Sequence, residues 1–236
     1  MNWFKTYIEK DRGINNAFSE WGTYYHHLMQ QLIQGELFEF ELKDKYNEMI
    51  KTCEHKFPPN KYVDLREKTY FGVMEHFDDF SWYEQFKILS CEENRQYDLK
   101  GIPFVSIADA EVEKIKTKEM GILDHKISKV FTKKDLSKKL KQLYVYSYSF
   151  KDVYGKYPEI LTFNHFKENK VVIHNFDKKE YDKTIKWLIN KIEYISKQTE
   201  FIPRCLQVED KTKDWYALYL CNHRKTCEYR PYIKNN

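Results

Sequence analysis

Residues 104–128, FVSIADAEVEKIKTKEMGILDHKIS, constrain the fold more than any other stretch of the chain. Residues 104–115 and 121–128 each have the composition of a strand, and the polar segment 116–119 between them can reverse the chain. This arrangement predicts a β-hairpin. Asp109 on the first strand then lies beside Asp124 on the second.

A strand over residues 121–128 brings Asp124 and Lys126 to the same face, because alternate residues share a face. Two close carboxylates raise each other's pKa unless a cation lies between them. A hard divalent ion, Mg²⁺ or Mn²⁺ rather than Zn²⁺, suits oxygen ligands. With Lys126 to orient a water and offset phosphate charge, the pattern predicts phosphodiester hydrolysis. The alternative is a solvated D-x-K pair, which is the usual meaning of so short a motif.

Length and charge set wide bounds on the class of protein. A chain of 236 residues suits one domain, or a nuclease-sized core with added helices. The formal net charge of +4 creates no global basic field, although local lysine clusters can attract nucleic acid. Aromatic residues make up 17% of the chain, and we assign most of them to the core. The lysine cluster comprises Lys133, Lys134, Lys138, Lys139 and Lys141.

The sequence contains neither an apolar run of membrane-spanning length nor the apolar centre of a signal peptide. We therefore expect a cytoplasmic protein, in a bacterial or phage-infected cell, with no membrane partner. Five cysteines without a secretory signal argue against a disulfide framework. The cysteines are then expected to be reduced thiols or ligands of a metal centre.

The first third of the chain has helical periodicity. Asn15 or Asn16 can cap a first helix that Gly35 ends, and this helix carries His26. A second helix should continue until Pro58 and Pro59, and a third should begin at Asp64. The three apolar stripes are Trp21, Tyr25, Leu28 and Leu32; Leu42, Tyr46, Met49, Ile50 and Cys53; and Phe71, Met74, Phe77 and Phe80.

Strand patterns begin at Phe86 and alternate with helices. After the hairpin we expect a helix over 134–153, strands over 160–166 and 170–176, and a long helix opened by Asp177. Gln142 and Tyr146 share a face of the first of these helices. The predicted fold class is α/β (α+β), a mixed sheet flanked by helices with an N-terminal helical region. We expect a single domain over 1–236, comprising a helical region (1–85), a core (86–200) and a cysteine-containing tail (201–236).

Four short motifs, taken in order, resemble the RecB-like branch of the PD-(D/E)XK nuclease superfamily, in particular the phage and CRISPR-associated RecB-like exonucleases. They are G-T-Y-Y-H (22–26), I-A-D (107–109), L-D-H-K (123–126) and Q-L-Y-V-Y (142–146). The resemblance covers nearly the whole chain. Four motifs in one order are far more specific than any one of them.

The resemblance implies a restriction-endonuclease-like core and a role for each motif residue. His26, rather than His27, would bind the metal together with Asp109 and Asp124. Lys126 would be the catalytic lysine, and the carbonyl of His125 would face the ion. Gln142 and Tyr146 would contact DNA near the scissile phosphate.

Each of these roles has a simpler alternative. His26 could be an ordinary packed or exposed histidine, and Gln142 with Tyr146 an ordinary polar pair on a surface helix. Relatives often carry an acidic residue just before the hairpin, where this chain has Glu92 and Glu93. Solvation is the simpler interpretation of that acidic pair.

The cysteines depart from the pattern of those relatives that bind a four-iron cluster. Cys221 and Cys227 have the expected five-residue gap, but Leu218 occupies the third cysteine position, and no cysteine precedes His26. Cys205 could replace one ligand of the cluster and Cys53 or Cys91 another, but such a cluster would need a different geometry. We therefore expect no complete iron–sulfur cluster, and a tail held by packing of Trp215, Tyr216, Tyr219 and Tyr229.

The functional expectation is a metal-dependent DNA exonuclease that acts on ends or single strands in phage or bacterial DNA processing or recombination. A helicase, integrase or recombinase would be a natural partner. The alternative is a non-catalytic nucleic-acid-binding or adaptor protein that retains the nuclease fold. A hydrolase of RNA or nucleotides is a third option, since no residue distinguishes ribose from deoxyribose.

Overall fold

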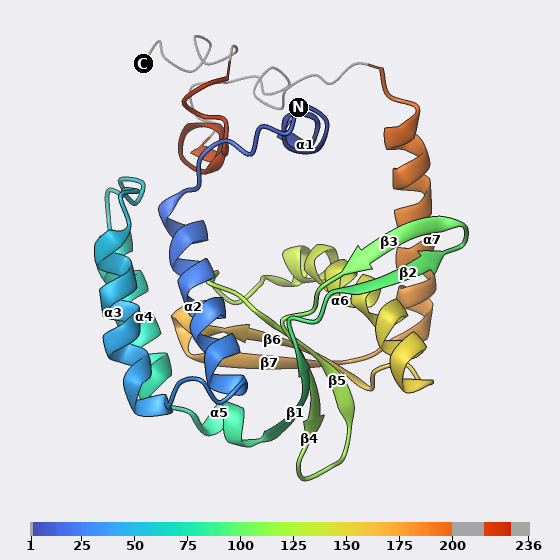
Figure 1. The fold of residues 1–236 in the computed structure, drawn as a ribbon, viewed down its shortest axis with the longest axis horizontal. Coiled ribbons are helices and arrows are strands. Elements are labelled where there is room, and N and C mark those ends of the chain that lie inside the picture. Colours follow the sequence, from blue (N-terminus) through green and yellow to red (C-terminus); the bar gives the residue numbers. More distant parts are fainter. Residues whose placement is uncertain (1, 200–214, 228–236) are drawn as a thin grey trace.

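A mixed five-stranded sheet forms the centre of the molecule, and helices cover it on two sides (Figure 1). The computed structural model describes residues 2–199 and 215–227. The predicted α/β class, a mixed sheet flanked by helices, is confirmed. Helices α2, α3 and α4 lie on one side of the sheet, and α6 and α7 lie on the other.

The strand order is β1-β4-β5-β6-β7. Neighbouring strands are antiparallel except for β5 and β6, which are parallel and are joined by the crossover helix α6. The predicted strands at 86, 121, 160 and 170 are confirmed. The strands are β1 (Phe86–Cys91), β4 (Ala110–Lys114), β5 (Met120–His125), β6 (Ile160–His165) and β7 (Lys170–Asn175), and the helix is α6 (Lys133–Tyr154).

The prediction of one strand over residues 104–115 is wrong. β3 ends at residue 106, and β4 begins at 110 in a different sheet. β3 pairs instead with a strand that we did not predict, β2, through a two-residue loop in which Lys100 (φ 56°) and Gly101 (φ 84°) are left-handed. The hairpin β2 (Arg95–Leu99) and β3 (Ile102–Ser106) is thus inserted between β1 and β4.

The N-terminal helices follow the predicted boundaries with one difference. Asn16 caps α2 through Ser19, and Asp64 caps α4. α3 ends at Thr52, well before the prolines, because the backbone at Cys53 is already extended. The helices are α1 (Asn2–Tyr7), α2 (Ala17–Ile33), η1 (Glu39–Glu41), α3 (Leu42–Thr52), α4 (Leu65–Asp78) and α5 (Ser81–Glu84).

The inward face of α4 differs from the predicted stripe at one residue. Phe71 is 59% exposed, whereas Phe77 is buried as predicted, and Thr69 and His76 are buried as well. A Cβ atom on Gly72 would lie 2.0 Å from the carbonyl oxygen of Lys167, so the glycine allows α4 to press against the β6–β7 connection. This contact and the hydrogen bonds of His76 select the inward face, and apolarity alone does not.

The second helical layer begins and ends where the sequence predicts. Thr132 caps α6, Gly155 (φ 71°) ends it, and Asp177 caps α7 (Lys178–Ser196). β6 and β7 are joined by the short helix η2 (Phe166–Glu168) and left-handed Asn169 (φ 44°). α6 and α7 pack against each other.

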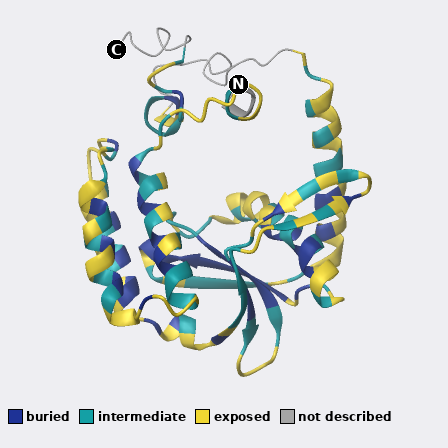
Figure 2. Cartoon of the chain, in the orientation of Figure 1, coloured by how far each residue is buried: buried dark blue, intermediate teal, exposed yellow. Residues whose placement is uncertain are grey.

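Two apolar cores lie on opposite faces of the sheet, and most strand residues between them are buried (Figure 2). Leu123 belongs to the core beneath α2 to α4, and its neighbour Ile122 belongs to the core beneath α6 and α7. In the first core the rings of Tyr25 and Phe166 stack 3.7 Å apart. Because β5 is buried on both faces, the residues at its end are held rigidly.

A C-terminal segment docks above the start of α2 (Figure 1). The amide of Ile14 donates to the carbonyl of Asn222 (2.9 Å), and the guanidinium of Arg224 donates to the carbonyls of Ile14 (3.1 Å) and Asn15 (2.5 Å). This segment contains the π-helix η5 (Tyr216–Leu220). The predicted tail residues Cys205 and Tyr229 lie outside the described residues. Cys53, Cys91, Cys221 and Cys227 form no disulfide with one another.

Among the described helices, none combines the length and the apolar character that a bilayer crossing requires.

Candidate functional site

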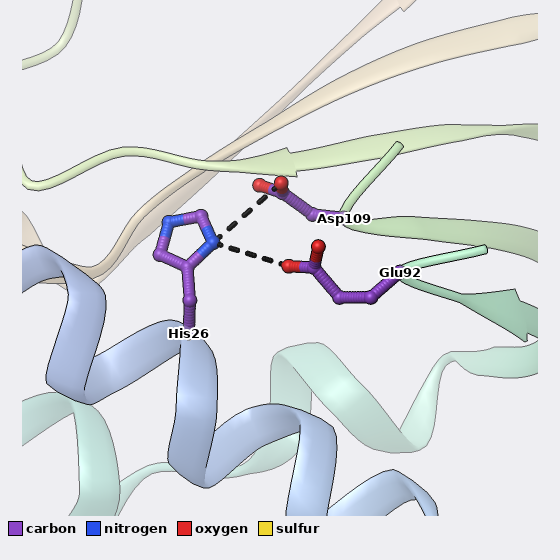
Figure 3. A group of neighbouring side chains, drawn as sticks. All are labelled: His26, Glu92 and Asp109. Carbon is purple, nitrogen blue, oxygen red and sulfur yellow. Dashed lines mark ion pairs between the residues drawn. The ribbon is translucent and has the colours of Figure 1, made fainter. Parts of the chain in front are cut away.

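Three side chains from three elements converge at one edge of the sheet (Figure 3). His26 comes from α2, Glu92 directly follows β1, and Asp109 directly precedes β4. Nδ1 of His26 lies 3.5 Å from Oδ1 of Asp109 and 3.6 Å from Oε1 of Glu92. One ligand atom from each residue lies within 4.8 Å of the others, so these three residues could hold a metal ion.

Strand pairing explains why the two acidic residues meet. Cys91 at the end of β1 is opposite Ala110 at the start of β4, so the residues beyond this pair are neighbours. Glu92 adopts a left-handed backbone (φ 52°), and its amide donates to the carbonyls of Ala108 (3.2 Å) and Asp109 (3.3 Å). These bonds close the chain at the base of the β2–β3 hairpin, with one acidic residue on each side.

A buried ion pair fixes the same base. Arg95, at the start of β2, pairs with Glu111 on β4, which is 3% exposed. Glu111 also accepts hydrogen bonds from Ser90 (2.6 Å) and from the hydroxyl of Tyr154 (2.9 Å). A charge buried with this many partners is rigidly held, so the loop that presents Glu92 and Asp109 has little freedom.

Asp109 and His26 are electrostatically linked. Burial alone would raise the pKa of Asp109, but His26 and the amide of His125, which donates to Oδ2 (2.6 Å), lower it below its usual value. Burial alone would lower the pKa of His26, but Asp109 and Glu92 raise it to about 10. Without a metal, a protonated His26 is therefore the cation between the two carboxylates.

Asp124 lies beside this group. Ala110 pairs with Leu123, so the register places Asp109 and Asp124 side by side. Asp124 is 1% exposed, and burial, then the charge of Asp109, raises its pKa to about 7 against the opposing effect of Lys126. Lys126 forms an ion pair with it (Nζ to Oδ2, 2.5 Å), and no other described residue donates a hydrogen bond to either oxygen. A buried carboxylate in this state favours a nearby cation.

Lys126 is held by a second element as well. Its ammonium donates to Oε1 of Gln142 (3.2 Å), and Nε2 of Gln142 donates to the hydroxyl of Tyr146 (2.9 Å). Both partners come from α6. Gln142 and Tyr146, the predicted DNA-contacting residues of α6, therefore form a hydrogen-bonded chain with Lys126, the predicted catalytic lysine.

Most of the predicted site residues meet in this region, in two groups. His26 and Asp109 lie together, and Asp124, Lys126, Gln142 and Tyr146 form a chain beside them. Glu92, which the sequence gave little reason to select, completes the compact group of three in place of Asp124. The available signal was its position directly after the strand FKILSC.

His125 has a different environment from its neighbours. Its ring is 4% exposed, and its Nδ1 lies 3.0 Å from Nδ2 of Asn164 inside the core. Asn164 also contacts the hydroxyl of Tyr25 (3.1 Å), which lies 2.9 Å from Nε2 of His76. Burial lowers the pKa of His125 to about 3 and that of His76 to about 4. The ring of His125 therefore belongs to a neutral buried network, and the prediction for this residue concerns its carbonyl.

No known protein family has a model that matches this chain, and no curated protein shows significant similarity to it. The interpretation of the site therefore depends on its geometry and on the motifs.

Proposed function

We propose that this protein is a metal-dependent DNA nuclease of the RecB-like type, which acts on DNA ends or single strands. One observation carries the proposal most directly. The buried carboxylate of Asp124 has the ammonium of Lys126 as its only donor among the described residues, and it lies beside the group of His26, Glu92 and Asp109. A structural ion pair would not require three further ligand-type side chains at the same position.

The donor set fits Mg²⁺ or Mn²⁺. The carboxylates of Glu92, Asp109 and Asp124 offer oxygen ligands, and the imidazole of His26 adds one nitrogen. A divalent ion bound here would lower the pKa of a water and offset the charge of a phosphate. Its binding would also displace the proton that makes His26 a cation in the metal-free protein.

The remaining residues position the substrate and the lysine. Lys126 is held by Asp124 from one side and by Gln142 from the other, so its ammonium can face a phosphate that lies against the carboxylates. Gln142 and Tyr146 would contact the nucleic-acid strand from α6. The proposed setting is DNA processing or recombination in a bacterial or phage-infected cell, beside a helicase, integrase or recombinase.

The test is cleavage of end-labelled single- and double-stranded DNA with Mg²⁺, with Mn²⁺ or with a chelator. We expect metal-dependent cleavage that Asp124→Asn abolishes. Asp152→Asn is the matched control, because Asp152 is an exposed aspartate on α6. DNA that persists in all lanes, together with tight and salt-sensitive binding, would replace the nuclease with a non-catalytic binding protein.

A further inference from the structure

The Lys167 side chain is largely buried, and its ammonium has no anionic partner among the described residues. The residue is 8% exposed, and it forms no hydrogen bond or ion pair with any described residue. Its Nζ lies 4.9 Å from the ring of Phe18, a contact that offers no hydrogen-bond acceptor. The stem of the side chain is buried and the ammonium opens onto solvent, so its three donors can meet an anion that enters from there. The position therefore favours an anion.

The lysine faces a cavity of about 590 Å³. The start of α2, residues 127–128 after β5, and the docked C-terminal segment form the other walls. Ser128 lines this cavity, and its Oγ has no hydrogen-bond partner among the described residues. A hydroxyl and an ammonium from separate elements thus have no protein acceptor in the same place.

The surroundings favour negative charge. α2 is a 17-residue helix whose N-terminus borders the cavity, and helix N-termini attract anions. The pKa of Lys167 is lowered to about 8, mainly by burial and then by the positive charges of Lys68 and Lys129. A bound anion would offset all three positive charges. Glu168 opposes them only in part.

The backbone holds Lys167 firmly in this position. Its carbonyl lies where a Cβ atom on Gly72 would be, so η2 and α4 are in direct backbone contact. The lysine therefore does not depend on a flexible loop. A fixed donor that lacks a partner is typical of a ligand site rather than of a solvated surface.

We propose that this cavity binds a phosphate group of the DNA strand on which the neighbouring site acts. Ile127, on its wall, lies 3.6 Å from the position of a Cβ on Gly22, one helical turn before His26. From Ser19 to His26 the distance along α2 is about 10 Å. The cavity therefore lies about two turns of α2 from the metal group, close enough for one strand to contact both. This inference rests on the proposed function.

The test is equilibrium binding of fluorescent oligonucleotides in chelator, where no cleavage is required. Lys167→Met should weaken binding about tenfold and lower the slope of log K against log salt by about one. Lys186→Met, an exposed lysine on α7, removes the same charge and should leave both unchanged. Lys167→Arg should retain the slope. Lys167→Met and Lys186→Met with equal affinities and slopes would overturn the proposal.

Ser128→Ala carries the test if Lys167→Met does not fold. Loss of one neutral donor should weaken binding about two- to tenfold without changing the salt slope. Wild-type affinity for this variant would overturn the proposal. Oligonucleotides with a 5′-phosphate, a 3′-phosphate or neither distinguish the source. A terminal preference that Lys167→Met removes identifies an end phosphate, and a Lys167→Met defect that is equal for all three identifies an internal one.

The two proposals can fail independently. If Lys167→Met cleaves and binds DNA as the wild type does, the phosphate-site proposal is wrong and the nuclease proposal stands. Binding that depends on Lys167 in a protein that never cleaves DNA removes the nuclease and leaves the phosphate site.

Discussion

Two histidine clusters lie side by side in this molecule, and their protonation states are opposite. The rings of His26 and His125 are only 5.6 Å apart. The pKa of His26 is raised to about 10, whereas those of His125 and His76 are lowered to about 3 and about 4. Burial lowers the pKa in each case, so the difference comes from the neighbours.

The charge of the neighbouring groups distinguishes His26, in the candidate metal site, from His76 and His125 in the buried network. His26 faces the carboxylates of Asp109 and Glu92, so its cluster favours a positive charge, either a proton or a metal ion. Nε2 of His76 contacts the hydroxyl of Tyr25, and Nδ1 of His125 contacts the amide of Asn164; both partners are neutral. Proximity to the candidate site therefore does not make a histidine part of it. The charge of its hydrogen-bond partners is the better guide.

The largest expected effect is on catalysis by the charged cluster. Lys126→Met removes the ammonium that both Asp124 and Gln142 hold, and we expect DNA cleavage to fall by about 100- to 10,000-fold. Initial rates with Mn²⁺ provide the measurement. Lys186→Met, which changes an exposed lysine on α7, should remain near wild type. Equal rates for both variants would remove Lys126 from the mechanism.

Metal binding should distinguish His26 from its neighbour. Mn²⁺ at about 100 times its Kd should raise the free energy of unfolding by about 2.7 kcal/mol. His26→Ala should lose this stabilisation, and His27→Ala, an exposed residue on the same helix, should keep it. Denaturation with and without Mn²⁺ measures the effect. Stabilisation that survives His26→Ala would show that the ion binds elsewhere.

Mutation of the neutral cluster should affect stability and leave metal binding intact. Tyr25→Phe removes the hydroxyl between His76 and Asn164 and should lower the free energy of unfolding by about 1–3 kcal/mol. The Kd for Mn²⁺, measured by titration calorimetry, should remain within about twofold. Tyr24→Phe, whose hydroxyl bonds a partly exposed Glu20, is the control and should cost less. If Tyr25→Phe folds normally but no longer binds Mn²⁺, the neutral histidine cluster would be part of the metal site.

The smallest effect is the pH dependence of the metal-free protein. Asp124 has a raised pKa of about 7, so the folded protein keeps a proton that the unfolded chain loses above about 4. The Asp124 contribution to stability should therefore fall as pH rises, by at most about 1.4 kcal/mol between pH 5 and 6. His125 and His76, which are neutral when folded and mostly protonated when unfolded, should raise stability over the same range. Urea denaturation in chelator provides the measurement. The stability of Asp124→Asn should rise more steeply with pH than that of the wild type, and equal slopes in the two proteins would remove Asp124 as the titrating group.

Local patterns predicted most of the fold. Asn16, Asp64 and Asp177 cap helices as the sequence indicates, because a cap needs only a few neighbouring residues. The inward face of α4 could not be predicted in this way. It depends on Gly72 meeting a carbonyl almost a hundred residues later.

The site was predictable where short motifs carry the chemistry, and less so elsewhere. Asp109, Asp124 and Lys126 fall on a hairpin that alternation and register bring together. The β2–β3 hairpin was missed because residues 104–115 have strand composition throughout, although Lys100-Gly101 between two apolar runs was a usable turn signal. Glu92 was undervalued for the same reason. Its proximity to Asp109 appears only once that hairpin is recognised as an insertion.

The tip of the inserted hairpin can change in length without affecting the candidate site. Glu92 and Asp109 are fixed where the insertion leaves and rejoins the sheet, by backbone bonds and the Arg95–Glu111 pair. The tip at Lys100 and Gly101 is exposed, and no heavy atom approaches within 4 Å of a Cβ built on Gly101. Extra residues spliced in at this tip would extend into solvent and leave the spacing of the two acids intact, so longer or shorter tips are where related chains can diverge without altering their chemistry.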